Sequence, residues 1–285
     1  MSIEDAKNWD FPPPNAGSLG RRIRNLAEKV DVDPDLMEVA FAQVVLGQML
    51  PGVLRGGAAL KIGIGPLGSR FSSDADLVLP HALVPDSFEG WINNGKKQWG
   101  QFRVSISRRK RDAQPEGVPP DYVIRTYTAR IFYGDGEWRA VKLEVGRDEV
   151  GGFQQPAQKI AEEWAAYFGK IGLDDPGAVA LFPYPEQIVQ KLDGCTRPDK
   201  KGDNDRAHDL VDIQLILLDT HIAPSSLYDL ARSTFAYRNV SWPPTARQFP
   251  SWATLYAADA VDYPEVVQDL DEAVRWLQRL IDEIG

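Results

Sequence analysis

The feature that most constrains the fold of this chain is a change in hydrophobic periodicity part-way along it. Up to about residue 150, short runs alternate apolar and polar residues as strands do, and from about residue 154 the apolar residues recur at helical spacing. The sequence therefore predicts an α+β fold, with a mixed sheet flanked by helices in residues 1–150 and a helical domain in residues 151–285. Residues 1–17, which include Pro12-Pro13-Pro14, are expected to form a mobile arm.

Individual elements follow from the same patterns. Strands are expected at residues 53–54, 76–79, 101–107, 122–132 and 138–145, the last two joined in a hairpin by the turn Gly134-Asp135-Gly136. Helices are expected at residues 19–30, 34–50, 58–62, 156–168, 185–195, 205–219, 225–236 and 264–283.

Composition narrows the class of protein. The chain has 285 residues, of which 43% are hydrophobic, so it can fill a core. It carries 32 basic and 41 acidic residues, and a net charge of −9 argues against adhesion to nucleic acid or to a membrane by bulk charge. Because Cys195 is the single cysteine and no segment approaches the roughly 20 apolar residues that cross a bilayer, we expect a cytoplasmic protein without membrane contact.

Two carboxylates at the start of an expected strand suggest a metal site. Asp74 and Asp76 point to the same side of the strand and could hold one or two hard cations, for which Mg²⁺ is the natural choice. Such sites usually need a third acidic ligand, and Glu144 is the candidate because it lies on the strand face opposite to its apolar neighbours. The residues alone leave open that Asp74 and Asp76 are turn and capping residues and that Glu144 lies on a solvated face.

Two groups of glycines could bind phosphate. Gly56-Gly57 lies at an expected strand-to-helix turn, where backbone N–H groups could approach a triphosphate. The segment GIGPLG, residues 63–68, fits the dinucleotide fingerprint G-x-G-x-x-G, but residues that look helical precede it and no helical apolar stripe follows it. We therefore interpret GIGPLG as a connecting turn.

Two blocks of sequence resemble a known family. Gly56-Gly57-Ala58-Ala59-Leu60, followed by R-x-S-x-D-x-D at residues 70–76, is similar to the signature of the AbiEii/AbiGii nucleotidyltransferase toxins. These MenT-like toxins of type IV toxin–antitoxin systems belong to the DNA polymerase beta-like nucleotidyltransferase superfamily. A helical lysine, Lys191, followed by R-x-x-D-x-x-D at residues 206–212, is similar to the second block of the family. Ala58 departs from the pattern, because many members carry serine or threonine there.

The resemblance implies a fold and a set of site residues. The fold would be a nucleotidyltransferase-like mixed sheet flanked by helices, followed by a helical C-terminal domain that closes the nucleotide cleft. The metal, Mg²⁺ or Mn²⁺, would be held by Asp74, Asp76 and Glu144, and the catalytic residues would be Asp74, Asp76, Lys191 and Asp209. The nucleotide would be bound by Gly56, Gly57, Arg70, Ser72, Lys191, Arg206 and Asp212. From the residues alone, the aspartates at 205, 209 and 212 could instead form a solvated helix face.

The resemblance also implies a function. The chain would transfer a nucleoside monophosphate from an NTP to an acceptor hydroxyl, at the 3′ end of tRNA, as the toxin of a pair with a cognate antitoxin. A basic run near the middle of the chain could contact the RNA, or it could be a solubilising hairpin tip. Its candidate contacts are Arg103, Arg108, Arg109, Lys110 and Arg111. Two alternatives remain: nucleotide transfer to a protein side chain or a small molecule, and a catalytically decayed module that binds NTP.

Overall fold

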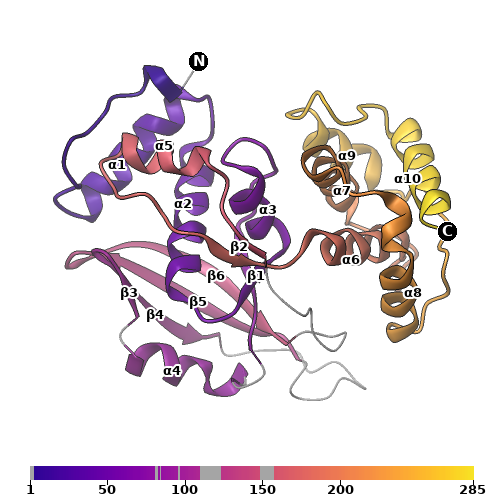
Figure 1. Ribbon diagram of the computed structural model, residues 1–285, viewed down its shortest axis with the longest axis horizontal. Helices are drawn as coiled ribbons and strands as arrows, with labels where there is room; N and C mark the ends of the chain where they lie inside the picture. The colour runs from indigo at the N-terminus through magenta and orange to yellow at the C-terminus, as the bar shows by residue number, and fades with distance from the viewer. Residues whose placement is uncertain (1–2, 81–82, 84, 96, 110–122, 148–156) are drawn as a thin grey trace. The chain divides into compact units, whose positions relative to one another are not determined.

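The computed structural model describes residues 3–80, 83, 85–95, 97–109, 123–147 and 157–285. The chain divides into two compact units, Met1–Phe182 and Pro183–Gly285 (Figure 1). The first unit extends past the expected end of the sheet domain at residue 150, because a strand at Val179–Leu181 pairs with a strand at Val53–Arg55.

The first unit contains helices and one mixed sheet. Its helices are α1 (Ala16–Lys29), α2 (Pro34–Met49), α3 (Gly56–Ile64), α4 (Phe88–Gly95) and α5 (Glu163–Lys170), with short 3-10 turns η1 (Ile3–Asp5) and η2 (Pro85–Ser87). Its strands are β1 (Val53–Arg55), β2 (Asp74–Val78), β3 (Gln98–Trp99), β4 (Phe102–Arg108), β5 (Arg125–Tyr133), β6 (Gly136–Gly146), β7 (Ala157–Lys159) and β8 (Val179–Leu181). The described strands follow the order β3-β4-β5-β6-β2-β1-β8-β7, with β2–β6 and β1–β8 parallel and the other neighbours antiparallel.

The α+β class is confirmed, and so are the five expected strands, which correspond to β1, β2, β4, β5 and β6. Three further strands, β3, β7 and β8, were not expected because each has only two or three residues, too few to show a periodicity. The expectation of a helix from residue 156 is wrong: β7 occupies Ala157–Lys159, and the helix α5 starts at Glu163.

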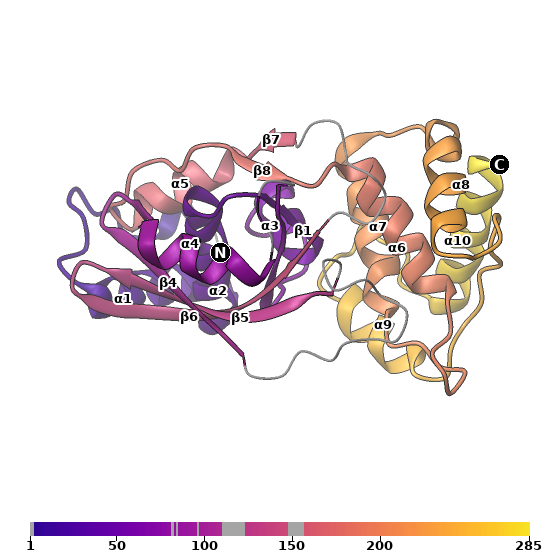
Figure 2. The same ribbon diagram turned by 90° about the horizontal axis from the view of Figure 1, so that it is seen from below.

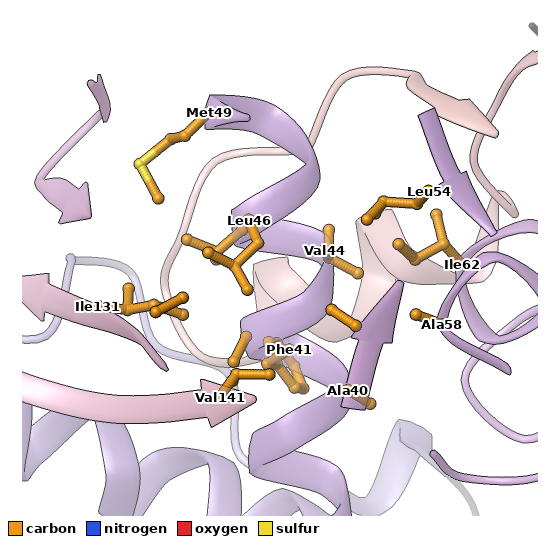
Figure 3. Close-up of a cluster of buried hydrophobic side chains, with 14 of the residues drawn as sticks. Ala40, Phe41, Val44, Leu46, Met49, Leu54, Ala58, Ile62, Ile131 and Val141 are labelled. Atoms are coloured by element: carbon orange, nitrogen blue, oxygen red, sulfur yellow. The ribbon is translucent and has the colours of Figure 1, made fainter. Parts of the chain in front are cut away.

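The core of the first unit is built around α2. From Met37 to Leu46 every residue of this helix is buried, as expected of a helix that is apolar on all sides. Figure 3 shows why: Phe41 and neighbouring side chains lie between Val141 and Ile131 of the sheet on one side and Leu54 and the apolar residues of α3 on the other. Asp33 caps the start of α2 by accepting hydrogen bonds from the N–H groups of the first turn. The helix therefore provides a rigid support for β1, α3 and the sheet.

The middle of the sheet has two different faces. Along β6, Val141, Leu143 and Val145 are buried, whereas Lys142 and Glu144 are partly exposed. In the parallel pair β2–β6, Asp74 lies opposite Lys142 and Asp76 lies opposite Glu144. The four side chains Asp74, Asp76, Lys142 and Glu144 thus share one face, which we call the polar face.

The second unit is helical. It contains α6 (Tyr184–Thr196), α7 (Ala207–Thr220), α8 (Tyr228–Tyr237), α9 (Trp252–Ala260) and α10 (Leu270–Ile284), with the 3-10 turn η4 (Pro224–Leu227) before α8. Figure 2 shows these helices from a second direction. The helix α9 was not expected, since its sequence WATLYAADA has no clear apolar stripe. Among the described residues, no helix has both the length and the apolar character that a membrane crossing requires.

Candidate active site

The polar face holds a lysine between two carboxylates. The Nζ atom of Lys142 lies 2.6 Å from Oδ2 of Asp74 and 2.7 Å from Oε1 of Glu144. The three side chains are 32%, 32% and 30% exposed, so the group lies at the edge of solvent. The hydroxyl of Ser73 donates to the other oxygen of Asp74. The hydrogen bonds that Lys142 donates, first that to Asp74 and then that to Glu144, raise the pKa of Lys142 to about 12.

The glycine turn lies directly against this face. The helix α3 starts at Gly56, whose φ of +64° is in the region that favours glycine. A Cβ atom on Gly56 would lie 2.6 Å from Oδ2 of Asp76, and one on Gly57 would lie 2.7 Å from Cβ of Ser72. Only glycines permit this approach. This approach brings the first N–H groups of α3 beside Asp76 and Ser72. The side chain of Arg55, the N-cap residue, makes no capping hydrogen bond to them.

The segment that precedes β2 is organised by Lys61, a residue that the sequence did not single out. Lys61 lies in α3 and is fully buried, and its Nζ atom donates hydrogen bonds to the carbonyl oxygens of Pro66, at 3.1 Å, and Ser69. The same atom lies 3.8 Å from the centre of the Phe71 ring, a favourable cation–π distance. Residues 65–68 of GIGPLG therefore form a connecting turn, as expected, whereas Gly63 and Ile64 are the last residues of α3. The turn is held by hydrogen bonds from Lys61.

A second unexpected residue, Gln43, fixes the start of β2. Gln43 is fully buried in α2, and its Nε2 atom donates to the carbonyl oxygens of Ser72 and Asp74, each at 2.9 Å. A signal was present in the sequence for both residues: Gln43 and Lys61 are polar side chains within otherwise apolar helical runs, and such residues are buried only with hydrogen-bond partners.

The residues of the second sequence block, Lys191 and R-x-x-D-x-x-D at residues 206–212, come together in the second unit. Nζ of Lys191, on α6, lies 2.9 Å from Oδ1 of Asp209 and 2.7 Å from Oδ2 of Asp212, both on α7. Nε of Arg206 donates to the other oxygen of Asp209 at 2.5 Å. Gly194 allows the two helices to approach, since a Cβ atom there would lie 2.6 Å from Asp209. The four side chains of this block are therefore in contact, and we call them the buried charge cluster: Lys191, Arg206, Asp209 and Asp212.

The burial of Asp209 and Asp212 corrects the alternative of a solvated helix face for these two residues, whereas Asp205 is exposed and precedes α7. The side chains of Asp209 and Asp212 are 0% and 1% exposed, and that of Lys191 is 8% exposed. Burial alone would lower the pKa of Lys191, but the charges of the two aspartates raise it above its usual value. Burial would likewise raise the pKa of Asp209, and the charges of Lys191 and Arg206 hold it below the usual value. Lys191 and Asp209 are therefore charged and paired.

The described members of the basic run have different partners. Arg103, at the start of β4, donates to the carbonyl oxygen of Gly134, whereas Arg108, at the end of β4, pairs with Asp86 at 2.8 Å. Nε of Arg109 lies 3.2 Å from the hydroxyl of Thr128, the residue that pairs with Lys142 in the sheet. The side chain of Arg109 thus contacts a residue whose strand partner, Lys142, lies on the polar face. The predicted contacts Lys110 and Arg111 lie outside the described residues.

The polar face has the donor chemistry of a hard metal site. Asp74, Asp76 and Glu144 provide carboxylate oxygens from matched positions of two parallel strands, and Mg²⁺ and Mn²⁺ prefer such ligands. In the described part of the chain no three acidic, histidine or cysteine side chains are arranged around one metal position. The ammonium of Lys142 lies between Asp74 and Glu144 instead. The donor set fits a divalent cation, provided that Lys142 moves.

The chain is similar to known proteins over most of its length. A family model described as the nucleotidyl transferase AbiEii toxin of type IV toxin–antitoxin systems matches residues 35–279. The chain belongs to this AbiEii family. Because the match spans both compact units, the sheet and the helices are parts of one AbiEii nucleotidyltransferase toxin. As such a toxin, the protein has an NTP as its substrate and an antitoxin as its partner.

One solved structure similar to this AbiEii chain is MenT4, a nucleotidyltransferase toxin from Mycobacterium tuberculosis. The two are 17% identical, and the alignment covers 88% of this chain and 94% of that chain with a TM-score of 0.49. No curated protein matches this chain.

Proposed function

We propose that this AbiEii toxin transfers a nucleoside monophosphate from an NTP to the 3′-terminal hydroxyl of tRNA, with Mg²⁺ or Mn²⁺ as cofactor, and so inhibits translation and growth. The observation that carries the proposal is the close approach of the first turn of α3 to Asp76, which Gly56 permits. It places the first N–H groups of α3, which suit phosphate oxygens and receive no hydrogen bond from the side chain of Arg55, beside a carboxylate that suits a metal.

In this proposal the first unit holds the triphosphate and the metal. The N–H groups at Gly56 and Gly57 bind phosphate oxygens, and Ser72 and Arg70 contact the nucleotide from the segment that Lys61 and Gln43 hold in place. Asp74, Asp76 and Glu144 provide the metal ligands. The bound metal would activate the attacking hydroxyl and neutralise charge on the phosphates.

The chemical step forms one bond and breaks another. The acceptor oxygen bonds to the α-phosphorus, the bond from that phosphorus to the bridging oxygen breaks, pyrophosphate leaves, and the hydroxyl proton passes to solvent. Positive charge from the protein stabilises the negative charge that develops on the leaving group. We assign part of this role to Lys191.

The different exposure of the residues in the second block suggests a different role for each. Asp209 and Asp212 are almost fully buried and hydrogen-bonded to Lys191, so in this proposal they orient the lysine and keep it charged. The side chain of Arg206 is 49% exposed and can contact a phosphate. Arg109, beside the strand that pairs with β6, is the basic residue that we assign to the RNA backbone.

The direct test uses the purified protein, total tRNA, Mg²⁺ and each of the four NTPs labelled at the α-phosphate. We expect labelled tRNA with at least one NTP and about a hundredfold or greater loss in the Asp76→Asn variant, because a metal ligand is removed. If no NTP labels tRNA while the protein still inhibits growth, the proposal fails. Label in protein from a lysate, with none in tRNA, would favour the alternative acceptor.

A pair of glycine variants tests the phosphate-binding turn in the same assay. Gly56→Ala and Gly134→Ala impose similar backbone strain, since φ is +64° and +57°, but a Cβ atom meets Asp76 only at Gly56 and finds nothing within 4 Å at Gly134. We therefore expect Gly56→Ala to lose most of the transfer activity and Gly134→Ala to retain it. Equal activity in the two variants would contradict a role for the turn.

A further inference from the structure

The polar face contains a positive charge that the proposed reaction does not use. Lys142 donates to Asp74 and Glu144, two of the three residues that we assign to the metal. We propose that Lys142 is a resident counter-ion that excludes a free divalent cation from the site and yields its position when a metal–nucleotide complex arrives. This inference concerns the regulation of the proposed nucleotidyltransferase site and rests on that function.

The position of Lys142 follows from the backbone. In the parallel pair β2–β6, Lys142 is the direct partner of Asp74, and Glu144 is two residues further along the same strand and hence on the same face. The register is fixed by five consecutive pairs, from Asp74 with Lys142 to Val78 with Gly146. An ammonium between the two carboxylates is therefore a consequence of strand pairing.

The surroundings allow the ammonium to leave. The side chain of Lys142 is 32% exposed and ends a flexible four-carbon stem, so the ammonium can reach another partner without disturbing the strand. On the neighbouring strand β5, Thr128 and Thr126 pair with Lys142 and Glu144, and their hydroxyls are neutral. Arg109, which donates to Thr128, adds a further positive charge on that side.

The charges explain why the nucleotide should control the exchange. A divalent ion alone must displace an ammonium that already has two carboxylate partners, and the ammonium then loses both. A metal–nucleotide complex brings phosphate oxygens, which give the displaced ammonium new partners at the same time. Metal and nucleotide binding are therefore coupled through Lys142, and the coupling must be reciprocal.

The experiment measures Mn²⁺ binding by the full chain without nucleotide, by calorimetry and by electron paramagnetic resonance. Because Lys142→Met removes the competing charge and keeps a side chain of similar length, we expect about tenfold tighter Mn²⁺ binding than in the wild type, within the usual range of coupling between two ligands. Lys142→Gln provides a second uncharged variant, and circular dichroism establishes that each variant is folded.

Lys29→Met is the matched control, because it makes the same substitution at an exposed position in the last turn of α1. Its Mn²⁺ affinity should equal that of the wild type. Unchanged, weaker or undetectable Mn²⁺ binding in both Lys142 variants overturns the inference, and so does an equal gain in Lys29→Met.

A second measurement adds a non-transferable NTP analogue. In the wild type the analogue should tighten Mn²⁺ binding more than it does in Lys142→Met, and an equal effect in both proteins would refute the coupling. The binding of Mn²⁺ by the analogue itself is common to both titrations and cancels in the comparison. Neither measurement requires turnover, so a wild type that transfers no nucleotide refutes the proposed function without affecting this comparison.

Discussion

Each unit of the molecule places one lysine between two carboxylates, but the two groups differ in burial. In the first unit, Lys142 and its partners Asp74 and Glu144 are each about a third exposed. In the buried charge cluster of the second unit, Lys191 is 8% exposed and its two aspartates are 0% and 1% exposed. The hydrogen-bond distances are nearly equal, so burial is the property that distinguishes the groups.

The difference shows that the same residue types serve two purposes. At the edge of solvent, a carboxylate that loses its lysine is rehydrated, so the pair contributes little to stability and can exchange partners. In the interior, the carboxylate cannot be rehydrated, so breaking the pair strongly destabilises the fold. The first arrangement suits ligand exchange, and the second suits the fixed placement of a charge.

The largest expected effect follows from removing the buried lysine. Lys191→Met leaves two buried aspartates without their main partner, and we expect the free energy of unfolding to fall by about 3–5 kcal/mol. Urea denaturation followed by circular dichroism measures it. Lys142→Met, the same change at the exposed group, should cost no more than about 1 kcal/mol. Equal losses in the two variants would show that burial does not separate the groups.

A smaller effect is expected at acid pH. The pKa of Asp209 is lowered in the folded protein, so its contribution to stability is complete above the unfolded pKa, about 4, and is lost as pH falls through the lower folded pKa. Stability should therefore decline below about pH 4, and the decline should be shallower in Asp209→Asn than in the wild type. Urea titrations at several pH values measure both slopes. Parallel slopes would contradict the charged state that we assign to Asp209.

The smallest effect is the salt dependence of the exposed group. The stability difference between the wild type and Lys142→Met should shrink in about 1 M NaCl, where charges are screened beyond about 3 Å. The difference for Lys191→Met should persist, because the side chains of Lys191, Asp209 and Asp212 are almost fully buried and salt screens buried pairs much less. Denaturation at low and high salt provides the measurement, and a salt-independent difference for Lys142→Met would contradict the partly solvated geometry.

The sequence predicted the residues of these groups better than their environments. Period-two alternation was sufficient to place Asp74 with Asp76 and to put Glu144 on the polar side of its strand, because side-chain direction in a strand is a local property. The same alternation puts Lys142 on the face of Glu144, but the pairing of Lys142 with Asp74 was not predictable, since it depends on the register between β2 and β6, which are far apart in the sequence. The burial of Asp209 and Asp212 depends likewise on which helices cover α7.

The limits of prediction in the rest of the fold have similar causes. The hairpin of β5 and β6 was expected from its turn and its long alternating strands, whereas β7 and β8 are too short to have a pattern. Gln43 and Lys61 were overlooked because their partners are backbone carbonyl groups, which every residue has and no sequence motif records.

The hydrogen bonds of Lys61 impose an unusual kind of constraint on the segment before β2. The ammonium binds the carbonyl oxygens of residues 66 and 69, which would be present whatever side chains stood at those positions. The number of residues between α3 and β2 is therefore fixed more strictly than their identity. Substitutions at positions 66 and 69 that keep the length of the segment leave these two carbonyl oxygens in place, whereas an insertion or a deletion would move Ser72 and Asp74 away from the glycine turn.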